Sequence, residues 1–116
     1  MNNPIVDKSK KIALRIIHLY KELTDEQKEF VLSKQILRSG TSIGANVRES
    51  QRGESKADFI HKLSISLKEA DETLYWLELL HDAEYISNEE FDSLFADCKE
   101  LVRILTAILK SSRDKQ

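Results

Sequence analysis

Apolar residues recur every three or four positions along almost the whole chain, and this spacing constrains the fold more than any other feature. The period matches the 3.6 residues of a helical turn, so each stretch would place its apolar side chains on one face. The two-residue alternation of a half-buried strand does not persist anywhere for long. Only one Pro and three Gly interrupt the 116 residues. The sequence therefore predicts an all-α fold.

Helix-start signals divide this pattern into four segments. Asn3 before Pro4 is typical of a helix start, and Thr24 with Gln27 matches a capping box, as does Ser87 three residues before Glu90. We expect helices at about residues 4–23, 25–52, 55–83 and 88–111. Ser55 would cap the third helix, Gly53 would stop the second, and the polar tail 111–116 would fray.

Four amphipathic helices with short links favour an antiparallel up-down-up-down four-helix bundle, with residues 1–116 as a single domain. No apolar run approaches the ~18 residues needed to cross a bilayer, so we expect no membrane partner. The N-terminus lacks the pattern of a signal peptide, and a lone Cys98 cannot form an internal disulfide. These features predict a cytoplasmic protein.

Residues 37–50 carry many small and hydroxyl side chains in the middle of the second predicted helix. Gly40 and Gly44 lie four residues apart beside Leu37, although a Gly inside a helix costs up to about 1 kcal/mol relative to Ala. Close packing would offset that cost. The spacing suits pairing with another helix, and it also suits a bulky neighbour that fits against the glycines.

Five cations fall within one arc when the second helix is drawn at 100° per residue. This basic stripe consists of Lys34, Arg38, Arg48, Arg52 and Lys56. Thr41 and Ala45 lie between its two ends, so the row could follow a phosphate backbone. A solvated helix face is the alternative, because no aromatic residue is interleaved and the net charge is −2.

The third helix has a second apolar face opposite its core stripe. This second face consists of Ile65, Glu72, Trp76, Leu79 and Ala83. A helix that is apolar on two sides usually contacts a further element, and four helices leave only another subunit to cover it. Trp76 would anchor that contact, since Trp is enriched at interface hot spots. Alternatively, Trp76 folds over its own neighbours.

No catalytic constellation can be assembled from the sequence. His61 and His81 each follow a carboxylate by three residues, but both lie on the third helix, about 30 Å apart, and cannot share an ion. Cys98 lies on an apolar stripe, which favours a buried structural thiol. We therefore predict no enzyme activity, no metal and no cofactor. Asn46 and Glu49 either bond to the third helix or cap a junction.

Three segments resemble the bacterial four-helix-bundle protein family, also called the 23S rRNA intervening-sequence protein family. They are SIGANVRE at 42–49, SKADFI at 55–60 and LKEADETLYWLELL at 67–80. The resemblance covers nearly the whole chain and implies a bundle. Related bundles assemble as ring-shaped pentamers, and a distant relative that assists a retroelement reverse transcriptase binds nucleic acid through a basic surface. The resemblance implies no catalytic residues.

These observations lead to two hypotheses. The first is a non-enzymatic homo-oligomer, with a pentamer favoured by the resemblance, that acts as an accessory factor binding RNA or DNA or working within a ribonucleoprotein. The basic stripe would contact phosphates. The alternative is a protein-interaction scaffold with no nucleic-acid role.

Overall fold

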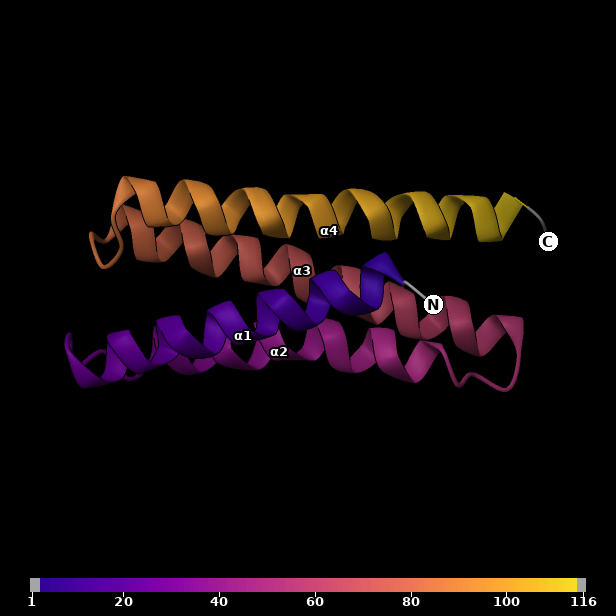
Figure 1. Ribbon diagram of the computed structural model, residues 1–116, viewed down its shortest axis with the longest axis horizontal. Helices are drawn as coiled ribbons and strands as arrows, with labels where there is room; N and C mark the ends of the chain where they lie inside the picture. Colours follow the sequence, from indigo (N-terminus) through magenta and orange to yellow (C-terminus); the bar gives the residue numbers. More distant parts are fainter. Residues whose placement is uncertain (1–2, 115–116) are drawn as a thin grey trace.

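The computed structural model describes residues 3–114, and within them it contains four α-helices and no strand. The helices are α1 (Pro4–Asp25), α2 (Leu32–Ser50), α3 (Lys56–Asp82) and α4 (Asn88–Asp114). They alternate in direction along a rod of 47 × 25 × 21 Å (Figure 1). The predicted all-α four-helix bundle is therefore confirmed. Residues 1, 2, 115 and 116, which the predicted domain and tail included, lie outside the described residues.

The core runs the length of the rod and is built from one buried stripe per helix. Each helix packs against its neighbour along the chain, and α1 also contacts α4 to close the bundle. The two 27-residue helices α3 and α4 extend beyond the 22 residues of α1 and the 19 of α2. Leu23, Ile43, Leu77 and Leu101 are fully buried representatives of the four stripes. This burial supplies the main driving force for folding.

The second helix begins at Leu32, seven residues later than the sequence pattern predicted. The Thr24 hydroxyl donates a hydrogen bond to Tyr20 O at 2.9 Å. Thr24 therefore belongs to α1 and does not cap α2. Lys28 then adopts a left-handed φ of 54°, which turns the chain. The Glu29 carboxylate accepts from the backbone N–H groups of Val31, Leu32 and Ser33 at 2.7–3.1 Å. Glu29 therefore caps α2, and the prediction of a Thr24–Gln27 capping box was wrong.

Other helix ends agree more closely with the sequence. Ser55 accepts from Asp58 N and Ser87 accepts from Glu90 N, each at 3.1 Å, as expected for caps of α3 and α4. Asn3 precedes Pro4 at the start of α1, but its side chain donates to Gln51 instead of capping the helix. Residues 111–114 continue α4, contrary to the expected frayed tail. Arg113 donates to Ser64 of α3 at 3.0 Å and so holds this last turn.

Gly40 lets α1 and α2 approach closely. A Cβ atom built on Gly40 would lie 2.8 and 2.9 Å from the two Cγ atoms of Ile16, which is itself buried in the core. The corresponding Cβ on Gly44 would lie 3.3 Å from Ser9 Oγ. Gly40 thus accommodates a bulky neighbour at position 16, one of the two arrangements that the glycine spacing suggested, whereas Gly44 faces the smaller Ser9.

Small polar side chains fill the contact between α2 and α3. Thr73 donates to Ser39 Oγ at 2.9 Å, and Ser66 donates to the carbonyl oxygen of Ile43 at 2.8 Å. All three hydroxyl residues are fully buried. Because every buried hydroxyl finds an acceptor, the small side chains allow close approach without the cost of an unpaired polar group. These residues serve the packing of α2 against α3.

Replacing Gly40 with Ala should destabilise the fold. Overpacking against Ile16 costs about 1–3 kcal/mol and is only partly offset by the gain of about 1 kcal/mol from removing a helical Gly. We expect a net loss of up to about 2 kcal/mol in the free energy of unfolding, measured with urea. Gly44→Ala is the matched control and should lose less. A Gly40→Ala variant as stable as the parent would show that Ile16 does not set this helix spacing.

Replacing Glu29 with Ala should remove the cap of α2 and lower the free energy of unfolding at pH 7 by about 0.5–2 kcal/mol. Glu26→Ala is the control, because the exposed Glu26 side chain caps no helix. Burial raises the Glu29 pKa, but its hydrogen bonds outweigh burial and hold the pKa below the ordinary value of 4.5.

This pKa shift fixes the pH dependence of the cap. A lowered pKa in the folded state gives stability that is complete above pH 4.5 and is lost as the pH falls through the folded pKa. The difference between the parent and Glu29→Ala should therefore shrink at low pH in urea titrations. A difference that stays constant down to pH 2 would contradict the carboxylate cap.

Candidate nucleic-acid interface

Only part of the basic stripe lies on α2, because this helix ends at Ser50 and the predicted single arc therefore does not reach Arg52 and Lys56. Lys34 and Arg48 lie on α2, Arg52 lies in the connection between α2 and α3, and Lys56 begins α3. All four side chains are exposed, and none forms an ion pair within residues 3–114. Three of them, at positions 48, 52 and 56, belong to the same end of the rod. These cations are therefore available to an external anion.

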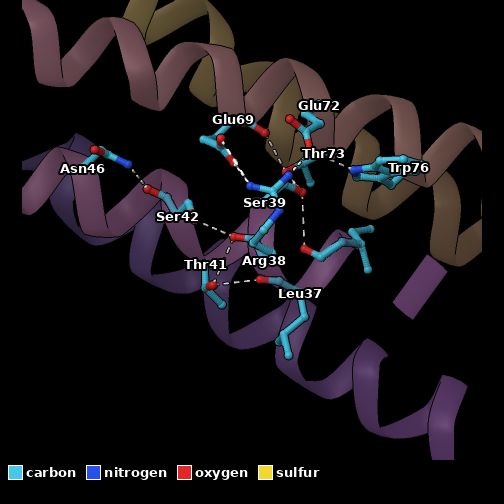
Figure 2. Close-up of polar contacts among 11 residues, drawn as sticks. Leu37, Arg38, Ser39, Thr41, Ser42, Asn46, Glu69, Glu72, Thr73 and Trp76 are labelled. Atoms are coloured by element: carbon cyan, nitrogen blue, oxygen red, sulfur yellow. Dashed lines mark hydrogen bonds and ion pairs between the residues drawn. The ribbon is translucent and has the colours of Figure 1, made fainter. Parts of the chain in front are cut away.

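Arg38, the fifth member of the stripe, already has two carboxylate partners on α3. Its guanidinium pairs with Glu69 at 3.0 Å and also with Glu72, whose carboxylate accepts from Trp76 Nε1 at 3.3 Å. Figure 2 shows the Arg38 side chain reaching from α2 toward this pair of carboxylates. The sequence predicted Arg38 as a phosphate ligand and Glu72 and Trp76 as interface residues. The structure joins all three in one network.

The second face of α3 is partly covered by its own chain. Ile65, Trp76 and Leu79 are half-buried, and Trp76 packs against the core. Ala83 is exposed and forms the C-cap of α3, so it lies just beyond the helix. Tyr75, which the sequence pattern did not single out, is 54% exposed, and its ring centroid lies 5.2 Å from that of Trp76. An accessible aromatic pair therefore marks this face.

The partners of Asn46 and Glu49 are now defined. Glu49 accepts from Lys62 of α3 at 2.9 Å, which is one of the two roles considered for it. Asn46 donates to Ser42 O at 2.9 Å within its own helix and therefore makes neither of the expected contacts (Figure 2). Glu49 pairs with Lys62 of α3, so these two opposite charges offset each other beside the stripe.

The side chains that could take part in chemical reactions are engaged in structural contacts. Burial, reinforced by Asp71 and Asp97, raises the pKa of the Cys98 thiol to about 12, and the thiol lies 3.5 Å from Ala70 O. A thiol of this kind is almost entirely protonated at neutral pH and is a poor nucleophile. His81 Nε2 lies 2.6 Å from Asn88 Oδ1, and its ring stacks on Phe91. Within residues 3–114, no cluster of three or more His, Cys, Asp or Glu is placed to hold a metal ion.

The structure adds one basic residue to the surface that the sequence did not connect with the stripe. Lys10 of α1 lies with Arg48 of α2 along a groove between these two helices. Their positions are 38 residues apart in the sequence, so only the pairing of α1 with α2 brings them together. No sequence signal marks Lys10 among the other lysines of α1.

Comparison with known proteins agrees with this architecture. A family model described as 23S rRNA-intervening sequence protein matches residues 1–107. The chain is also similar to the crystal structure of a protein of unknown function from the S23 ribosomal protein family of Bacteroides thetaiotaomicron. The two are 58% identical over 91% of this chain and 98% of that chain, with a TM-score of 0.91. A search of curated proteins gives no match.

None of the described helices is long and apolar enough to span a membrane. The family model extends over all four helices and ends only within the last turns of α4. The chain belongs to the 23S rRNA-intervening sequence protein family.

Proposed function

We propose that this chain is a non-enzymatic, homo-oligomeric accessory factor that binds RNA through the basic stripe. One observation carries the proposal: Lys34, Arg48, Arg52 and Lys56 are exposed and unpaired within residues 3–114. A phosphate backbone can contact such cations without breaking an ion pair of the protein, and each contact releases condensed counterions from the nucleic acid.

The distribution of charge supports a local binding surface on an otherwise acidic protein. Residues 1–58 carry three more basic than acidic side chains, whereas residues 59–116 carry five more acidic than basic ones. A polyanion would therefore be attracted to the side of the rod formed by α1 and α2, which carries Arg48, and repelled by much of α3 and α4. This asymmetry favours one side of the rod for the RNA.

Arg38 contributes less to this surface than its position suggests. Its guanidinium would have to leave Glu69 and Glu72 before it could bind a phosphate. The proposed contact set is therefore centred on Arg48, Arg52 and Lys56, with Lys34 as a more distant contact. Arg38 instead connects the stripe to the Trp76 face through Glu72.

A non-enzymatic role is supported by the state of the reactive groups. The buried hydroxyls of Ser39, Ser66 and Thr73 bond to one another or to the backbone, and the Cys98 thiol is held in its protonated form. A cytoplasmic location fits this proposal, because an unpaired thiol is compatible with a reducing compartment.

Self-association would compensate for the small number of cations on one copy. The half-buried Trp76, with Tyr75 beside it, supports a contact between copies at the second face of α3. A ring would present several stripes to one RNA and raise the overall affinity through effective concentration. The pentamer is the ring that we favour, from the resemblance to related bundles.

Arg48→Ala and Arg52→Ala should each weaken RNA binding and lower the slope of log K against log salt by about 1, because each removes one phosphate contact. Binding would be measured by fluorescence anisotropy from ~50 mM salt upward. Arg103→Ala is the matched control, since Arg103 is an exposed arginine on α4 without an ion pair in the described residues. Arg38→Ala should change the slope less than either.

Two results would contradict this part of the proposal. One is the absence of RNA binding by the parent protein at ~50 mM salt, and the other is unchanged binding by both arginine variants. A protein partner recovered equally well after nuclease treatment, and by the doubly substituted protein, would support the scaffold alternative instead.

Trp76→Ala should shift the protein from oligomer to monomer in light scattering at micromolar concentration, because it removes the anchor of the proposed contact. Leu79→Lys, on the same face, should act in the same direction. Leu14→Ala is the control, as Leu14 is an apolar residue of α1 that is 50% exposed. Circular dichroism would verify that each variant remains helical. A parent protein that is monomeric at this concentration would exclude the Trp76 interface.

A further inference from the structure

A groove of about 370 Å³ runs between α1 and α2 on the outside of the bundle. Its lining consists of Val6, Ser9, Lys10, Ala13, Thr41, Gly44, Ala45 and Arg48. Most of its surface is apolar, because small side chains face each other where the two helices come close at Gly44. The volume falls in the range of about 300–1,000 Å³ that is typical of sites for small organic ligands.

Two cations from different helices border this groove. Lys10 and Arg48 are both exposed, and neither forms an ion pair within the described part of the chain. Their charge adds to that of Arg52 and Lys56, so the groove is continuous with the basic stripe. Two positive charges beside an apolar hollow repel a cation and favour an anion that also has an apolar part.

A hydroxyl in the groove can also orient such an occupant. Thr41 donates its hydroxyl hydrogen to Leu37 O at 2.7 Å, so its oxygen keeps acceptor capacity while its donor is used by the helix. Ser9, whose hydroxyl donates to Val6 O at 3.1 Å, is buried beneath the groove and offers no such contact. An N–H group on the edge of a base can donate a hydrogen bond to the Thr41 oxygen.

We propose that this groove binds one unpaired nucleotide of an RNA strand, which deepens the proposed RNA-binding function and rests on it. The base lies on the small apolar wall formed by Val6, Ala13 and Ala45, and the flanking phosphates contact Lys10 and Arg48. A paired base is enclosed in the helix and cannot enter, whereas single strands, bulges and loops can extrude a base. The groove therefore selects RNA with unpaired nucleotides over continuous duplex.

The test fills the groove without disturbing the core. Ala45 is exposed, so Ala45→Leu adds bulk to the hollow, and Ala107→Leu adds the same bulk to an exposed site on α4. Lys10→Ala removes one bordering cation, and Lys11→Ala is its neighbour outside the groove. Each protein would be titrated against a single-stranded oligoribonucleotide and a continuous RNA duplex of equal length.

Ala45→Leu should weaken binding of the single strand roughly tenfold, because the added side chain excludes the base from the groove, and leave duplex binding unchanged. Lys10→Ala should lower the salt slope for the single strand by about 1. Ala107→Leu and Lys11→Ala should match the parent. Thermal unfolding of Ala45→Leu would verify its fold, and Lys10→Ala tests the site without added bulk.

The outcomes separate this inference from the function on which it rests. If the parent binds no RNA, both fail. If Arg52→Ala weakens binding while Ala45→Leu and Lys10→Ala bind single strands like the parent, the nucleotide site is wrong and the basic stripe stands. Loss of self-association or of a protein partner in Ala45→Leu, with RNA binding unchanged, would assign the groove to a docked helix and would also overturn the nucleotide site.

Discussion

The close packing of α2 against both of its neighbours is the constraint on which the rest of the structure depends. On one side Gly40 leaves room for Ile16 of α1, and on the other Ser39 bonds to Thr73 of α3. A larger side chain at position 40 would push α1 away, and an apolar one at position 39 would leave the Thr73 hydroxyl with only its intrahelical acceptor. Because protein interiors are packed as densely as organic crystals, such contacts restrict the distance between neighbouring helices.

This spacing also determines the chemistry of the surface. Since α2 lies close to α3, Arg38 reaches Glu69 and Glu72 and ceases to be a free cation. Since α2 lies close to α1, Lys10 joins Arg48 at one groove. The packing of α2 thus pairs one cation of the stripe with carboxylates of α3 and places a lysine of α1 beside another. The result is a cationic surface concentrated toward the connection between α2 and α3.

Much of the fold could be predicted because helix formation and apolar periodicity are local properties. The stripe through Ile12, Ile16 and Leu19 identifies α1 without reference to any other helix, and Ser55 and Ser87 mark helix starts by contacts within four residues. The start of α2 could not be predicted in this way. The Thr24 hydroxyl could cap a following helix or bond within its own helix, and it bonds to Tyr20 of α1. The cap of α2 comes instead from the carboxylate of Glu29, three residues before Leu32.

The candidate site was predictable only in part, for a related reason. The sequence by itself determined which side chains share a helix face, because the 100° rotation per residue is fixed: hence the cations of α2, its buried face and most of the second face of α3. Only the tertiary structure decided that Arg38 is paired, that Glu49 bonds to Lys62, and that Lys10 borders a groove with Arg48. Those pairings depend on the axial register and separation of two helices, which side-chain packing between them sets and which the periodicity of a single helix does not encode.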